Sequence, residues 1–135
     1  MIIIVVVDAN ILISALLGGK PHRILFDSRF QFITTERTTW EVKRYIPFLA
    51  KKLGLAELEI LSAFESLPIT AYQSRYYAEQ LPKAHTLIAT RDAKDVDILA
   101  LALAAGAPLW SQDRDFEHIE EIIWVTTEEM MEWIV

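Results

Sequence analysis

The stretch that organises this sequence is Arg91-Asp-Ala-Lys-Asp-Val-Asp-Ile-Leu-Ala-Leu-Ala-Leu-Ala-Ala-Gly106. Its second half predicts a buried helix, because alanine and leucine have high helix propensities and Gly106 suits the position just past a helix end. Its first half places three aspartates within six residues, Asp92, Asp95 and Asp97. One aspartate at a helix N-terminus is an ordinary cap, favoured by the helix dipole and the free N–H groups. Three together predict a positive group held between them.

The composition indicates one globular domain. The chain has 135 residues, of which 53% are hydrophobic, enough to fill a core. It contains no cysteine, which excludes disulfides, thiolate metal sites and cysteine nucleophiles and suits a reducing cytoplasm. The apolar start, residues 2–7, is too short for a signal peptide or a membrane span. We therefore expect a single cytoplasmic domain over residues 1–135 with no membrane association.

Apolar β-branched runs alternate with helical patterns along the chain. The run at 2–7 is apolar throughout, which is typical of a central parallel strand covered on both faces. The spacing of the aromatic residues predicts that most of them pack in the core. This alternation predicts an α/β fold, a three-layer α/β/α sandwich with a central, mostly parallel sheet of four or five strands. We expect strands at 2–7, 31–35, 107–111 and 122–126, a strand or connector at 68–71, and helices at 11–16, 21–29, 36–53, 55–67, 73–90, 92–106 and from 127 onward.

Acidic residues follow the expected strands. Asp8 comes directly after the first strand, and Asp113 follows the strand at 107–111. Because the carboxyl ends of parallel strands share one edge, where open α/β sheets bind ligands, these two side chains should converge. Asp92 and Asp95 open the helix before the Asp113 strand and would share one helix face at the same edge. The alternative is that each aspartate only caps a helix, although serine or threonine would serve equally well as a cap.

A group of four or more carboxylates predicts a metal site. Such a group cannot stay fully ionised unaided, so protons or a cation must offset its charge. Oxygen ligands without cysteine or paired histidines favour Mg²⁺ or Mn²⁺. These ions bridge to phosphate and activate water for displacement at phosphorus. They would also let a chain of formal net charge −6 bind a polyanion that it otherwise repels.

Other charged residues near this edge leave two readings open. Glu41 lies in the first turns of the helix at 36–53, where a solvated side chain is the commonest outcome. Arg91, Lys94 and Arg114 stand beside the aspartates. They either contact phosphate or only balance the neighbouring carboxylates.

Four short motifs occur in order along the chain: Val-Val-Asp8-Ala-Asn10, Thr-Thr-Trp-Glu41-Val, Asp92-Ala-Lys-Asp95-Val and Trp-Ser-Gln-Asp113-Arg-Asp115-Phe. Together they resemble a PIN domain, the metal-dependent nuclease fold of many prokaryotic toxins, and the resemblance covers nearly the whole chain. It implies a parallel sheet between helical layers. It also implies an acidic quartet that binds Mg²⁺ or Mn²⁺ and carries catalysis, formed by Asp8, Glu41, Asp95 and Asp113.

The same resemblance assigns supporting positions. Asp92 and Asp115 match positions that are often acidic and would be accessory, and Asn10 and Ser111 match polar positions that orient a water or a carboxylate. Asp97 does not fit the pattern and is expected to cap its helix.

The relatives implied by this resemblance cleave single-stranded or structured RNA. Many are toxins silenced by an antitoxin whose segment enters the acidic groove, and many form homodimers. The resemblance thus implies an Mg²⁺- or Mn²⁺-dependent endoribonuclease with an RNA substrate, an antitoxin partner and a homodimeric state.

Two other functions remain open. One is a phosphoacceptor or phosphotransfer domain with Asp8 as the nucleophile, for which Ser111 is suitably placed although no lysine stands at a strand end. The other is a non-catalytic PIN-like module that binds RNA or a protein. Retention of all four quartet positions argues against that second alternative.

Overall fold

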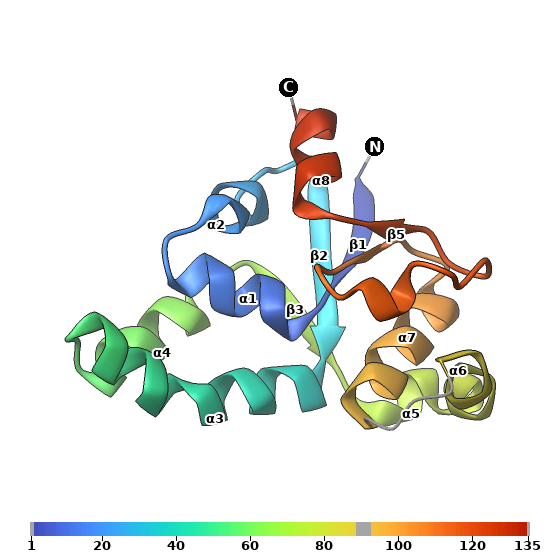
Figure 1. Ribbon diagram of the computed structural model, residues 1–135, viewed down its shortest axis with the longest axis horizontal. Helices are drawn as coiled ribbons and strands as arrows, with labels where there is room; N and C mark the ends of the chain where they lie inside the picture. Colours follow the sequence, from blue (N-terminus) through green and yellow to red (C-terminus); the bar gives the residue numbers. More distant parts are fainter. Residues whose placement is uncertain (1, 89–92, 135) are drawn as a thin grey trace.

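A five-stranded, all-parallel sheet forms the centre of the protein, with helices on both of its faces (Figure 1). The computed structural model describes residues 2–134 apart from residues 89–92. This arrangement confirms the predicted three-layer α/β class, with five strands in the sheet and every pairing parallel. The strand order is β3-β2-β1-β4-β5, with bounds β1 (Ile3–Val7), β2 (Phe30–Thr35), β3 (Ile69–Tyr72), β4 (Leu109–Trp110) and β5 (Trp124–Val125).

The helices divide between the two faces of the sheet (Figure 1). One face carries α1 (Ala9–Leu16), α2 (Lys20–Leu25) and α8 (Thr127–Ile134). The other carries α5 (Ser74–Tyr77), α6 (Leu81–Ile88) and α7 (Ala93–Ala105). The pair α3 (Glu36–Leu53) and α4 (Glu57–Glu65) extends outward beside α1, and two 3-10 turns, η1 (Ala78–Gln80) and η2 (Arg114–Phe116), complete the chain. Within the described residues, no helix has the length and apolar character that crossing a bilayer requires.

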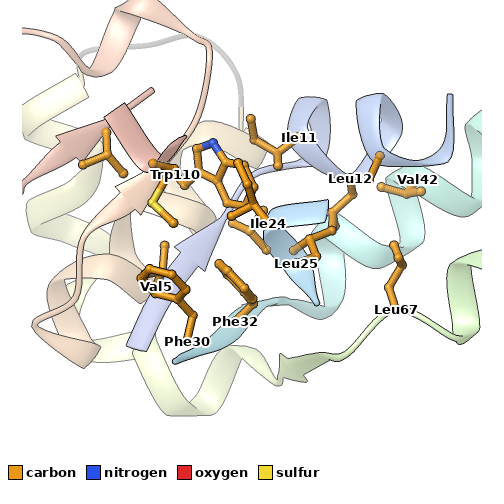
Figure 2. Close-up of a cluster of buried hydrophobic side chains, with 14 of the residues drawn as sticks. Val5, Ile11, Leu12, Ile24, Leu25, Phe30, Phe32, Val42, Leu67 and Trp110 are labelled. Atoms are coloured by element: carbon orange, nitrogen blue, oxygen red, sulfur yellow. The ribbon is translucent and has the colours of Figure 1, made fainter. Parts of the chain in front are cut away.

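Strand side chains alternate between two cores. Successive residues of a strand point to opposite faces, so Val5 and Val7 enter one core and Val6 enters the other. Because Val5, Val6 and Val7 are buried between the two cores, the carboxyl-terminal half of β1 has to be apolar on both sides, which explains the last three residues of the apolar run. Figure 2 shows the first core, where strand side chains meet those of α1 and α2: Val5, Phe30, Phe32, Trp110, Ile11, Leu12, Ile24 and Leu25.

Two expectations about β1 and the aromatic residues are wrong. Residues 2–4 are exposed, since β4 pairs only with Val6 and Val7 and leaves the start of β1 uncovered. Aromatic side chains also lie on the surface more often than their spacing predicts. On α3 the buried stripe carries aliphatic residues spaced three or four apart, which leaves three rings exposed on other faces: Trp40, Tyr45 and Phe48.

Pro47 and Pro82 occupy different positions in their helices. Pro47 does not divide its helix, because α3 continues to Leu53. The expected single helix at 73–90 is instead α5, η1 and α6, and its last two residues lie outside the described ones. Pro82 is the second residue of α6, where the N–H that proline lacks has no intrahelical partner to lose.

Trp110 links β4 to the terminal helix and should carry much of the stability. It is fully buried, its ring centre lies 5.6 Å from that of Phe32, and its indole Nε1 donates a hydrogen bond to Thr127 Oγ1 at 3.1 Å. Trp110→Ala is expected to lower the free energy of unfolding by about 3–5 kcal/mol. Trp133→Ala, at a tryptophan that is 42% exposed, is the matched control and should cost clearly less. Urea denaturation followed by circular dichroism measures both, and equal losses would contradict this account of the core.

Candidate active site

The strand order reverses beside β1, and the candidate site lies at that point. The chain adds β2 and β3 on one side of β1 and then returns to add β4 and β5 on the other. In open parallel sheets, ligands bind at the carboxyl ends of the strands where the order reverses. Asp8 directly follows β1, while Ser111 and Asp113 follow β4, so sheet topology alone brings these three residues to one place.

Asp8 is held by hydrogen bonds to both of its carboxylate oxygens. As the N-cap of α1, it accepts the backbone N–H of Ala9 at Oδ1, at 2.8 Å. Its Oδ2 accepts the hydroxyl of Ser111 at 2.8 Å, and the Asn10 side-chain amide lies 3.4 Å from the same oxygen. The side chain is only 9% exposed, so this carboxylate has a fixed orientation.

Ser111 connects the two strand ends. Its hydroxyl is buried, donates to Asp8 and accepts the backbone N–H of Asp113 at 3.0 Å. The Asn10 amide also reaches this hydroxyl, at 3.3 Å, while the Asn10 oxygen accepts the N–H of Gln112 at 3.3 Å. Asn10 and Ser111 therefore orient a carboxylate and the loop after β4, which is one of the two tasks that the sequence suggested for them.

Three aspartates form a group of carboxylates beside Asp8. Carboxylate oxygens of Asp95, Asp113 and Asp115 all lie within 4.8 Å of one another. Asp95 stands in the first turn of α7 and is 7% exposed. Asp113 caps η2, and its Oδ1 accepts the N–H of Asp115 at 2.9 Å. Asp115, expected to be accessory, thus lies in the same group of carboxylates as Asp95 and Asp113.

Glu41 approaches from α3 and completes one cleft. Its Oε2 lies 3.7 Å from Lys94 Nζ, an ion pair that ties α3 to the start of α7. A cleft of about 580 Å³ is lined by all four residues of the predicted quartet, Asp8, Glu41, Asp95 and Asp113, together with Ala9, Asn10, Ile13, Trp40, Arg44, Tyr45 and Lys94. The structure therefore gathers residues that are distant in sequence at one edge of the sheet.

The electrostatics of the cleft favour a cation. Burial raises the pKa of Asp8 above its ordinary value, and the nearby charge of Asp113 raises it further. The Ser111 and Ala9 hydrogen bonds lower that pKa, as does the charge of Lys94, but they offset burial only in part. Asp8 and Asp95 are both buried carboxylates beside other acids, and ionised groups in that setting need compensating charge.

The donor set fits a hard divalent ion. Every candidate ligand is a carboxylate oxygen, three such oxygens lie close enough to share an ion, and the described chain offers no sulfur or imidazole at the cleft. Oxygen-rich sites of this kind suit Mg²⁺ and Mn²⁺.

Some predicted residues do not reach the cleft. Arg114 pairs with Glu117 at 2.8 Å and is not among the cleft residues, whereas Lys94 is. Arg91 and Asp92 lie outside the described residues. Asp97 is not a helix cap, because α7 begins four residues earlier and its side chain accepts the hydroxyl of Tyr77 at 2.6 Å.

Among the residues of the cleft wall that sequence reasoning missed are Trp40 and Arg44. The Arg44 guanidinium carbon lies 4.7 Å from the centre of the Trp40 ring. The sequence does place these two residues together, because Trp40 and Arg44 are four apart and share one face of a helix. Trp40 also stands next to Glu41, a predicted site residue. The spacing of the aromatic residues instead predicts the core for most of them, whereas Trp40 is 53% exposed.

The raised pKa of Asp8 predicts a pH-dependent stability in chelator-treated protein. The folded state holds the Asp8 proton more tightly than the unfolded chain, so ionisation of Asp8 destabilises the fold, and the cost grows as the pH rises from the unfolded pKa to the raised folded pKa. This cost disappears as the pH falls below the unfolded pKa of about 4. Asp8→Asn should therefore be more stable than the wild type at neutral pH, and the difference should shrink on acidification, as measured by denaturant titration at several pH values.

Asp27 provides a control of opposite sign. Its hydrogen bonds with Arg29 lower its pKa to about 2, so its ionised form favours the folded state. Asp27→Asn should reduce stability at neutral pH, with the difference fading as the pH falls through that lowered pKa. If Asp8→Asn behaves like Asp27→Asn, Asp8 does not pay a burial cost.

Comparisons with known proteins identify a family and similar folds. The family model of the PIN domain matches residues 6–132. The fold is similar to that of a chain in VapBC2 from Rickettsia felis bound to a promoter DNA fragment, with a TM-score of 0.69 and 17% identity over 92% of this chain and 98% of that chain. It is also similar to a chain of a toxin-antitoxin complex from Klebsiella pneumoniae, with a TM-score of 0.64 and 23% identity over 91% of this chain and 97% of that chain. No curated protein matches the sequence. The family model spans nearly the whole chain, and this protein therefore belongs to the PIN domain family.

Proposed function

We propose that this protein is an endoribonuclease that hydrolyses RNA phosphodiester bonds with Mg²⁺ or Mn²⁺ at the acidic cleft. The observation that carries the proposal is the convergence of Asp8, Glu41, Asp95 and Asp113 on one cleft at the carboxyl edge of the sheet. Membership of the PIN domain family supports nuclease chemistry at such a cleft.

In this proposal, the carboxylates of Asp8, Glu41, Asp95 and Asp113 hold the ion, and Asp115 assists through its contact with Asp95 and Asp113. When bound, the ion supplies a water of lowered pKa and charge opposite the phosphate. Ser111 and Asn10 orient the Asp8 carboxylate, so it keeps a fixed position in the lining of the cleft.

Basic residues at the cleft supply the phosphate contacts in this proposal. Lys94 lies against Glu41, and Arg44 lies over the Trp40 ring, both in the cleft wall. Their charges would attract the substrate backbone to a cleft whose own charge is neutralised by the ion.

The decisive test is cleavage of a panel of RNAs by the wild type and by Asp8→Asn. Wild-type protein should cleave at least one RNA with Mg²⁺ or Mn²⁺, and chelation should stop cleavage. Asp8→Asn should lose more activity than the about 10- to 100-fold expected for loss of an outer contact. Asp27→Asn, at an aspartate remote from the cleft lining, is the matched control and should retain full activity.

Several outcomes would contradict this proposal. Equal cleavage by the wild type and Asp8→Asn would remove the mechanism. A phosphoaspartate trapped at Asp8 with an acyl phosphate would favour the phosphoacceptor alternative. Calorimetry showing no Mg²⁺ or Mn²⁺ binding would favour a non-catalytic module.

Ser111→Ala tests the role of the buried hydroxyl. This change removes the hydrogen bond to Asp8 Oδ2 and the acceptor for the Asp113 N–H. Activity should fall by about 10- to 100-fold and the metal requirement should rise, because outer contacts orient the ligands. Ser62→Ala, on the exposed surface of α4, is the control. Metal titrations of cleavage rate measure both effects, and an unchanged metal requirement would assign Ser111 a purely structural role.

We further propose that the protein is the toxin of a toxin-antitoxin pair and forms a homodimer. Two solved structures that share its fold come from VapBC2 and from a toxin-antitoxin complex. Growth arrest on expression of the wild type but not of Asp8→Asn, relieved by a co-expressed protein encoded next to it, would support the toxin role. Sedimentation analysis would establish the oligomeric state.

A further inference from the structure

A second cleft adjoins the acidic one, and Trp40 is the wall between them. This second cleft, of about 400 Å³, is lined by Trp40 and by Glu36, Arg37, Ser74, Tyr77 and Asp97. Its volume lies within the range of about 300–1,000 Å³ typical of ligand sites. Trp40 lines both clefts and is 53% exposed, so its indole is accessible at the boundary between them.

One face of α3 carries the residues that border both clefts. Arg37, Trp40, Glu41 and Arg44 are spaced three or four apart, which places them along one side of the helix. Arg37 lies in the wall of the second cleft and Arg44 in the wall of the acidic cleft, so a guanidinium group stands one turn away on each side of the indole. Arg44 lies over the ring, with its guanidinium carbon 4.7 Å from the ring centre.

Polar contacts join three residues of the second cleft, Tyr77, Asp97 and Arg37. Tyr77 donates its hydroxyl to Asp97 at 2.6 Å, and Arg37 Nε lies 3.6 Å from the other Asp97 oxygen. Burial and the Asp97 carboxylate raise the pKa of the Tyr77 phenol, so the hydroxyl stays neutral. Arg37 is thereby held in the wall of the cleft beside the indole.

We propose that Trp40 is a base-stacking platform for a nucleotide that flanks the scissile phosphate. This inference rests on the proposed nuclease function of the acidic cleft. An aromatic ring beside cationic groups fits alternating bases and phosphates, as in proteins that bind single strands. A base inside a duplex is already stacked on both sides, so only a strand that is unstacked locally can place a base on the indole. Because every base has a π face, the platform selects strandedness more than sequence.

The test uses a single-stranded RNA oligonucleotide with the fluorescent base 2-aminopurine at successive positions. Binding is measured in Ca²⁺, with a gel confirming that the RNA stays intact. One labelled position should be quenched strongly on binding to the wild type, and Trp40→Leu should abolish that quench. Trp40→Leu should also weaken single-strand binding by about 5- to 100-fold. Trp40→Phe, which keeps an aromatic ring, should recover much of the quench and of the single-strand affinity. A fully paired duplex should bind weakly to the wild type and to both Trp40 variants.

Phe48→Leu is the matched control for these measurements. Phe48 is an exposed ring on the same helix, 52% accessible, but it lines neither cleft. It should bind RNA and quench the probe as the wild type does. Circular dichroism should show that the variants keep the fold, as expected for changes at exposed side chains.

Three outcomes would overturn the inference: wild-type affinity and quenching in Trp40→Leu, an equal loss in Phe48→Leu, or equal affinity for duplex and single strand. Unchanged RNA binding together with lost binding to a protein partner would assign the indole to that partner instead. Failure of the nuclease proposal is distinguishable, since it appears as full activity in Asp8→Asn, whereas the quench depends only on Trp40 and the bound base.

Discussion

The hydrogen bond from Ser111 to Asp8 fixes the geometry on which the rest of the cleft depends. It joins the carboxyl ends of two adjacent parallel strands, β1 and β4, at the point where the strand order reverses. It also holds a carboxylate that is nearly buried and close to the charge of Asp113. Without such anchoring, like charges at this edge would separate into solvent, because their mutual repulsion and the cost of burial both favour that outcome.

Two apolar cores make this unfavourable gathering possible. The central strands place alternate side chains on opposite faces, and each face is covered by helices, so the sheet is rigid where the carboxylates emerge. The four acidic residues of the cleft then come from four kinds of position: a strand end for Asp8, α3 for Glu41, the first turn of α7 for Asp95 and the loop after β4 for Asp113. Stability built in the cores thus supports a site where the burial and the mutual repulsion of carboxylates are unfavourable.

α3 has a double role that its pattern only partly revealed. Its aliphatic stripe anchors it to the body of the protein, while its opposite side borders two clefts and carries Glu41 into the first of them. The sequence did not reveal that Trp40 borders the clefts, because an aromatic residue at helical spacing can lie on the buried or the exposed face of a helix. Only the position of the helix relative to the sheet decides which side is buried.

The sequence alone predicted the α/β class and the parallel sheet. It also predicted the strand-end position of Asp8 and Asp113 and the list of acidic candidates. Those features follow from local periodicity and from the rule that parallel strands share one carboxyl edge. The tertiary structure decided which candidates meet: Glu41 reaches the cleft, Asp115 stands with Asp95 and Asp113, Arg114 turns to Glu117, and Asp97 binds Tyr77. These outcomes depend on how separate helices dock on the sheet, and docking is set by packing between residues far apart in the chain, which local patterns do not encode.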